Sequence, residues 1–264
     1  MKQKMTSKML IIAVLLTVAA GPLWAQNEGA GTPGEGHQLP LKWGIGATLY
    51  NQTQPYNIVS LQIPLAGLDL GAADGLEIEN NTTSYHLKFD YWLFPFLNVF
   101  LLGGQIDGTT TVKLSNVDLG LPITLNNIKL DYSGFMYGGG ATLAFGGKGW
   151  FTSLTYDITE TDLDVASSAV SAWVVTPRFG LTFSGAAIWI GAMYQNAEET
   201  HEGVWNMPFL GAVPYHAVLE QSEPWNYQIG MVAGLGEHWN LTLEGGIGSR
   251  KSVLAAAEYR FGKR

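Results

Sequence analysis

Ser84, His86 and Asp90 lie at alternate positions of one segment, and together they could carry out hydrolytic chemistry. Residues two apart in an extended strand point to the same side, so these three side chains would share one face. A serine activated by a histidine, which a carboxylate orients, is the arrangement of acyl hydrolases. Lys88 falls between His86 and Asp90 on that face and interrupts a simple relay. We therefore assign no catalytic residue and expect no enzymatic activity.

A wider set of charged residues follows the same alternation along the chain. If the strands close into a barrel, these side chains face the lumen and have two possible roles. They could line a pore and select solutes, or they could pair with one another and close the lumen, which is the interpretation we prefer. Their mixed signs favour neither cations nor anions. The set comprises His86, Lys88, Asp90, Asp157, Arg178, Glu244, Glu258 and Arg260.

The elements that would position these residues are strands, because apolar and small or polar residues alternate with a period of two. Between residues 84 and 93, for example, Tyr85, Leu87 and Phe89 alternate with polar residues. The chain is 47% hydrophobic and only 14% charged, with a mean hydropathy of +0.10. After residue 25 it has no apolar run of the roughly 18 residues that a membrane helix needs. An apolar chain without such runs is typical of a membrane barrel, in which lipid-facing residues occupy alternate positions.

The N-terminus predicts export. Lys2, Lys4 and Lys8 precede an apolar run and the sequence Gly-Pro-Leu-Trp-Ala, which ends at Ala25, as in a secretory signal peptide. We expect a signal peptide over residues 1–25, a Gly- and Pro-rich flexible tether over 26–40 and a single barrel domain over 41–264. Loss of the three lysines moves the formal net charge from −8 to about −11, which disfavours nucleic acid as a partner. The absence of cysteine rules out a disulfide framework.

Connection lengths and aromatic residues indicate how the strands are arranged. Short turns are expected at 94–96, 146–149, 184–186 and 236–238. Long loops are expected at 51–83, 108–129, 160–171 and 197–223, with a tight last loop near Ser249. This alternation predicts about ten antiparallel strands, with eight or twelve as alternatives. Aromatic residues gather near both strand ends, as in the interfacial bands of membrane barrels. Tyr50 and Tyr132 have the opposite parity and are expected to point inward, and Pro177 is expected to mark a bulge.

The last strand carries Val253, Ala255, Ala257, Tyr259 and Phe261 on one face. This aromatic C-terminal pattern is similar to that of small bacterial outer-membrane β-barrel proteins, and the chain resembles them from about Leu41 to Phe261. The resemblance implies an all-β fold, a single transmembrane antiparallel barrel with short periplasmic turns and long extracellular loops. It also implies a location in the outer membrane of a Gram-negative bacterium, with both termini periplasmic. The barrel-assembly machinery, outer-membrane lipid and lipopolysaccharide are the implied partners.

The function stays open among three hypotheses. The leading one is a narrow porin-like channel or transporter that admits or binds a small solute, which could be apolar because Ile58–Leu65 and Leu119–Leu125 are apolar. Lumen-facing glycines, Gly138 among them, would leave space inside the barrel or would relieve crowding of its wall. The alternative is a structural or adhesion barrel that acts through its loops. A lipid-modifying outer-membrane hydrolase is third. We expect no metal and no cofactor, because the acidic clusters match no known metal loop.

Overall fold

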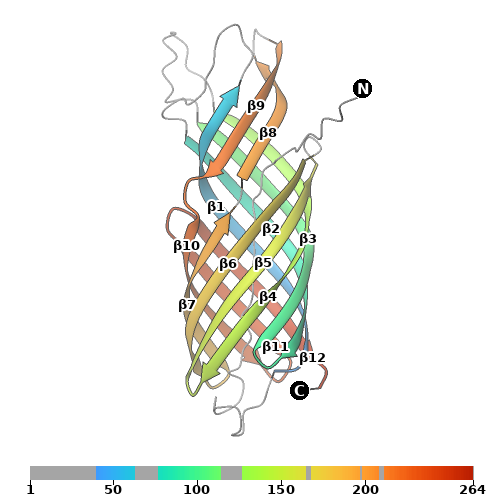
Figure 1. The fold of residues 1–264 in the computed structure, drawn as a ribbon, viewed down its shortest axis with the longest axis vertical. Helices are drawn as coiled ribbons and strands as arrows, with labels where there is room; N and C mark the ends of the chain where they lie inside the picture. Colours follow the sequence, from blue (N-terminus) through green and yellow to red (C-terminus); the bar gives the residue numbers. More distant parts are fainter. Residues whose placement is uncertain are drawn as a thin grey trace, which may run out of the picture.

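Alternation of outward apolar and inward polar residues produces strands throughout the part of the chain that the computed structural model describes, and these strands form a barrel (Figure 1). The described residues are 40–62, 77–113, 127–164, 168–196, 198–207 and 211–263. The predicted signal peptide and nearly all of the predicted tether lie outside them. No helix in this part of the chain is long and apolar enough to cross a membrane.

The first six strands run up and down in sequence order. They are β1 (Trp43–Gln62), β2 (Glu77–Phe94), β3 (Leu97–Lys113), β4 (Ile128–Gly147), β5 (Trp150–Leu163) and β6 (Ser168–Phe183). The other six are β7 (Ala186–Asn196), β8 (Glu198–Met207), β9 (Gly211–Gln221), β10 (Trp225–Leu235), β11 (Trp239–Ile247) and β12 (Lys251–Phe261).

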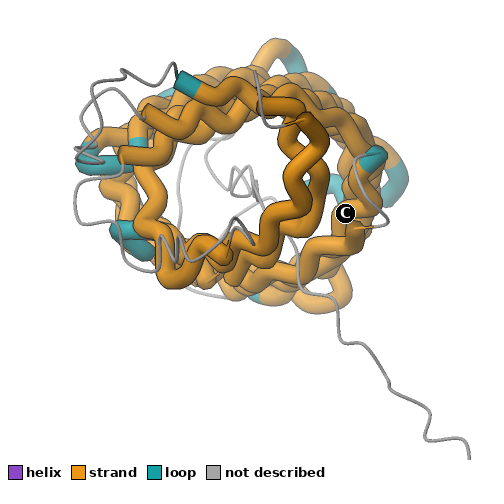
Figure 2. Tube along the Cα trace, turned by 90° about the horizontal axis from the view of Figure 1, so that it is seen from above, coloured by secondary structure: helices purple, strands orange, loops and turns teal. Residues whose placement is uncertain are grey.

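Ten of these strands close the barrel. The sheet runs from β12 through β11, β10 and β7 to β1, and β1 pairs with β12, so the ring has no free edge (Figure 2). The fold is therefore the closed ten-stranded antiparallel barrel that the sequence predicted. Closure matters because every backbone polar group within a membrane must find a partner inside the protein.

The strands β8 and β9 form a hairpin outside the ring. β12 begins only at Lys251, and its ladder with β1 reaches Thr53, so β1 beyond that point lacks β12 as a neighbour. From Tyr56 to Gln62, β9 pairs with β1 in its place, with a bulge between Ile58 and Ser60. The hairpin thus covers an edge that would otherwise expose unpaired backbone groups. The sequence prediction, which left residues 197–223 as a loop, was wrong here.

The predicted loop boundaries also need correction. β1 extends to Gln62 and β2 begins at Glu77, so much of the predicted first loop is strand. β3 and β4 likewise extend into the predicted second loop, to Lys113 and from Ile128. The rest of both apolar loop segments lies outside the described residues. The four short turns lie where they were predicted, and we call their side of the barrel the turn end and the opposite side the loop end.

The two faces of each strand have opposite environments. In β2, inward residues from Ile78 to Trp92 are buried, whereas Tyr85, Leu87 and Phe89 are exposed on the outside. The same alternation recurs in β5, β10 and β11. Large apolar side chains therefore cover the outer surface, which is the surface chemistry of a barrel surrounded by lipid.

Aromatic side chains on the outer surface form the two expected bands. Near the turn end, Phe96 stacks on both Phe94 and Phe145. Nearer the loop end, Tyr156, Trp173, Tyr194 and Trp225 form a continuous series of ring contacts across four neighbouring strands. Rings at these two levels suit the two interfaces between lipid and water.

Two local predictions have different outcomes. Tyr50 and Tyr132 point inward as predicted, since both are buried. The bulge predicted at Pro177 is wrong: Val175 pairs with Tyr194 and Arg178 with Gly191 in unbroken register, and only the pairs between them are missing. Because proline has no N–H, the ladder is interrupted without any inserted residue.

Candidate functional site in the barrel interior

Four predicted residues form an ion-pair network near the turn end, which we call the turn-end network. It consists of Lys88 and Asp90 on β2 and Glu258 and Arg260 on β12. Lys88 Nζ lies 2.9 Å from Glu258 Oε2 and 3.7 Å from Asp90 Oδ2. The Arg260 guanidinium lies 2.5 Å from Glu258 Oε1 through Nη1 and 2.9 Å from Asp90 Oδ1 through Nη2. The network holds two cations and two anions, so its charges balance.

The turn-end network is also tied to its surroundings. Asn98 donates to Asp90 Oδ1 at 2.7 Å, and Arg260 Nε donates to the carbonyl oxygen of Leu41 at 3.1 Å. All four charged residues are buried. The strand register explains why these four charged residues lie together. On β1, Gly44 lies between Asp90 of β2 and Arg260 of β12. Gly46 lies in the same way between Lys88 and Glu258. A Cβ on Gly44 would lie 2.2 Å from Asp90 Oδ2, so the missing side chain leaves room for Asp90 and Arg260 to meet across β1.

A second balanced pair lies further along the interior wall. Arg178 of β6 contacts Glu244 of β11, with Nη2 2.8 Å from Oε2. Trp189 of β7 donates its Nε1–H to the same carboxylate oxygen at 2.8 Å. Since β7 and β10 separate β6 from β11 in the sheet, this contact crosses the inner surface of the wall.

The remaining predicted residues are His86 and Asp157, and both are buried. His86 Nδ1 lies 3.5 Å from Ser84 Oγ, at the outer limit of a hydrogen bond. Asp90 is engaged with Asn98 and Arg260, so the structure does not bring Ser84, His86 and Asp90 together as a relay. All eight predicted residues thus lie inside the barrel, and six of them pair in two balanced groups. Whether any of them contacts a passing solute stays a prediction.

Polar residues near the loop end form a different group, which we call the loop-end band: Gln52, Gln54, Gln195, Gln221 and Arg250. Tyr50 donates to Gln52 at 3.3 Å, Gln52 to Gln54 at 3.5 Å and Gln54 to Gln221 at 3.3 Å. Gln221 donates in turn to the carbonyl oxygen of Gln195, and Arg250 Nη1 donates to Gln195 Oε1. Apart from Arg250, the band is uncharged.

The sequence pattern did not identify Arg250, because this residue lies in the tight loop before β12. A signal was present, since Arg250 has the same parity as Ser252, Leu254 and Glu258, all of which face inward. Extending the alternation of β12 back by one residue would have placed its guanidinium inside the barrel.

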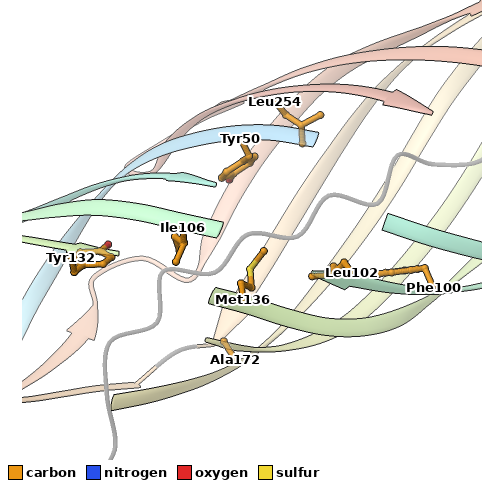
Figure 3. Packing of buried hydrophobic residues seen from close by; sticks show 8 residues of the cluster. All are labelled: Tyr50, Phe100, Leu102, Ile106, Tyr132, Met136, Ala172 and Leu254. Carbon is orange, nitrogen blue, oxygen red and sulfur yellow. The ribbon is translucent and has the colours of Figure 1, made fainter. Parts of the chain in front are cut away.

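One stretch of the inner wall is apolar. Its buried side chains come from β1, β3, β4, β6 and β12 and form one cluster, which we call the apolar wall (Figure 3). Its members are Tyr50, Phe100, Leu102, Ile106, Tyr132, Met136, Ala172 and Leu254. The interior of membrane barrels is usually polar, so a contiguous cluster of buried apolar side chains inside the barrel is unusual.

Gly138 and Gly140, on the lumen side of β4, do not create empty space. A Cβ on Gly138 would lie 2.2 Å from the carbonyl oxygen of Ile158, and one on Gly140 would lie 2.3 Å from that of Tyr156. At these positions the backbone of β5 already occupies the volume that a side chain would need. The glycines therefore permit close packing of the wall, which favours the second of the two roles that the sequence left open.

A polar groove of about 530 Å³ lies near the loop end, along β2, β3 and β4 and next to Asp164, which follows β5. Its lining includes Asn81, Asp107, Asp131 and Asp164. Asp164 accepts hydrogen bonds from the hydroxyl and the backbone N–H of Ser133, at 2.5 and 3.0 Å, and these bonds lower the pKa of its carboxyl. Among the described residues, no cluster of three or more His, Cys, Asp or Glu could hold a metal ion.

Comparison with known proteins supports the fold. No protein-family model matches the chain, and no curated protein matches its sequence. Among solved structures, the outer membrane protein OprG from Pseudomonas aeruginosa matches with a TM-score of 0.50 and 11% identity, covering 84% of this chain and 98% of OprG. The fold is thus that of bacterial outer-membrane β-barrels.

Two further matches are more distant. The transport unit of the autotransporter AIDA-I from Escherichia coli has a TM-score of 0.43 and 9% identity, covering 88% of this chain and 92% of that unit. The COG4313 outer membrane channel from Pseudomonas putida F1 has a TM-score of 0.38 and 13% identity, covering 87% and 99%. At such identities the likeness concerns the fold alone.

Proposed function

We propose that this protein is an outer-membrane barrel whose lumen binds a small solute with apolar surface and lets it cross the membrane. The observation that carries the proposal is the apolar wall. A barrel that served only as scaffold would not need a contiguous apolar cluster in its interior, because balanced ion pairs can fill a closed lumen. Apolar side chains that converge from several strands offer such a solute a favourable surface along its path.

The proposal includes an orientation. The turn end faces the periplasm together with both termini, and the loop end faces outward, since short periplasmic turns and longer external loops are the rule for outer-membrane barrels. Lipid and lipopolysaccharide would surround the aromatic bands, and the barrel-assembly machinery would insert the chain through its aromatic last strand. A protease-accessible tag placed in the Ser249 loop tests this orientation: cleavage on intact cells agrees with it, and protection contradicts it.

The transport experiment compares two methionines. Met136 belongs to the apolar wall, whereas Met193 is equally buried but lies outside it. Uptake of radiolabelled toluene is measured in a Gram-negative host that expresses the wild-type protein, Met136→Gln or Met193→Gln at equal levels of folded barrel. We expect the wild type and Met193→Gln to raise uptake above the empty host, and Met136→Gln to lose most of this increase.

A second candidate function is binding through the loop end without transport. The observation that favours it is the projecting sheet in which β9 pairs with the extension of β1 (Figure 1). Such a sheet presents a rigid surface to a partner. This hypothesis predicts that uptake of toluene equals that of the empty host. It also predicts that deletion of the β8–β9 hairpin abolishes attachment of the protein to its binding partner.

The third hypothesis is hydrolysis of lipid through Ser84 and His86. It predicts altered lipid A or phospholipid when the purified protein is mixed with lipid, and loss of this effect in Ser84→Ala.

A further inference from the structure

Arg250 is the largest of the fully buried side chains in the described structure, and its charge is not neutralised there. Its backbone carbonyl accepts a hydrogen bond from Asn226 Nδ2 at 2.7 Å, which fixes the loop between β11 and β12. Its Nη1 donates to Gln195 Oε1. Within the described residues, no carboxylate forms an ion pair with Arg250, in contrast to Arg178 and Arg260.

The unused donors of Arg250 lie on one edge of the guanidinium. Nε and Nη2 are both buried and have no hydrogen-bond partner in the described structure. These two N–H groups point the same way in arginine, and this edge can bind both oxygens of a carboxylate. Gln195 Nε2, on the amide whose oxygen accepts from Nη1, is a further buried donor without a partner in the described structure. The band therefore has an excess of donors around a single cation.

An unpaired buried cation costs free energy, so a site of this kind is stable only when an acceptor completes it. We propose that Arg250 binds the carboxylate of a small solute in the lumen at the loop end, with Nε and Nη2 each donating to one carboxylate oxygen.

The apolar wall indicates what the rest of this solute is. Tyr50 donates a hydrogen bond to Gln52 of the loop-end band, and in the β1–β12 ladder it pairs with Leu254. Both residues belong to the apolar wall, which begins next to the loop-end band. A solute with its carboxylate on Arg250 would therefore place an apolar body against Tyr50 and Leu254. This inference rests on the proposed function and names its substrate class as small amphipathic monocarboxylates.

The experiment measures equilibrium binding of radiolabelled benzoate to the purified full-length barrel in lipid nanodiscs, with empty nanodiscs as background. Arg250→Gln removes the charge and both free donors. Lys251→Gln is the matched control, because it makes the same change of charge one residue along the chain at an exposed side chain. We expect benzoate affinity to fall about tenfold or more in Arg250→Gln and to stay unchanged in Lys251→Gln. Benzyl alcohol, which lacks the carboxylate, should bind equally to both variants.

Equal benzoate binding by Arg250→Gln and the wild type, or no binding by the wild type, overturns the inference. Equal competition by inorganic phosphate overturns the assignment to carboxylates. If Arg250→Gln fails to form a heat-modifiable barrel, Arg250→Lys replaces it: that variant keeps the charge but loses the two-pronged edge, and it should bind benzoate more weakly than the wild type. Toluene uptake through the apolar wall is measured independently, so failure at Arg250 and failure of the proposed transport are distinguishable.

Discussion

The two ends of the barrel solve the problem of buried charge in opposite ways. At the turn end, Lys88, Asp90, Glu258 and Arg260 neutralise one another within hydrogen-bonding distance. At the loop end, the Arg250 guanidinium donates to the amide oxygen of Gln195 and has no carboxylate partner in the described structure. A balanced network is complete without a ligand, whereas an unbalanced cation is not. The comparison teaches that burial alone does not identify a binding residue, and that the balance of charge around it is more informative.

The largest expected effect comes from breaking the turn-end network. Glu258→Gln leaves Lys88 and Arg260 with one anion, Asp90, to share, and removal of one partner from a buried pair costs about 3–5 kcal/mol. We expect this loss in the free energy of unfolding, measured by urea titration in lipid vesicles. The exposed pair between Lys113 and Glu77 is the control, and Glu77→Gln should cost less than about 1 kcal/mol. Equal losses in the two variants would show that the network is not a structural unit.

A smaller effect tests whether the lumen-facing glycines permit close packing of the barrel wall or leave open space in the lumen. In Gly138→Ala the new Cβ meets the backbone of Ile158, while Gly245 has open space around it. We expect Gly138→Ala to lower the free energy of unfolding by about 1–3 kcal/mol and Gly245→Ala to change it little. Unchanged stability in Gly138→Ala would instead favour the interpretation that glycines leave lumen space.

The smallest effect concerns Asp164, a charged residue on the outer surface that belongs to neither the turn-end network nor the loop-end band. Ser133→Ala removes the hydroxyl that bonds to Asp164, so the pKa of this carboxyl should rise toward its ordinary value. A depressed pKa favours the folded state at neutral pH, and this contribution is lost as the pH falls through the folded pKa. NMR titration of the Asp164 carboxyl checks the shift. An unchanged pKa would assign the depression to the surroundings of Asp164 other than the Ser133 hydroxyl.

Much of the barrel follows from the sequence because alternation and turn chemistry are local signals. The short turns and the inward direction of His86, Lys88 and Asp90 depend only on parity within one strand. The β8–β9 hairpin was missed because its strand pairing depends on where β12 ends, which is a property of barrel closure. The partners of each charge were equally out of reach, since Arg178 meets Glu244 across two intervening strands.

The candidate site shows the same limit. Parity finds the buried charges but does not reveal which of them are neutralised, because this depends on the stagger between strands. Arg260 and Arg250 lie on the same face of one chain segment, yet the first meets two carboxylates and the second meets none in the described structure. Whether a buried charge is neutralised, and so whether it is free to bind a ligand, therefore depends on the folded structure and not on the sequence pattern alone.

The most direct test of this account measures the free energy of unfolding of the wild type, Arg260→Gln and Arg250→Gln in lipid vesicles without added solute. Arg260→Gln leaves Asp90 and Glu258 with Lys88 as their remaining cation and should lose about 3 kcal/mol or more. Arg250→Gln removes an unpaired buried cation, so it should be as stable as the wild type or more stable. A loss in Arg250→Gln as large as that in Arg260→Gln would contradict the account, because it would show that the protein itself neutralises Arg250.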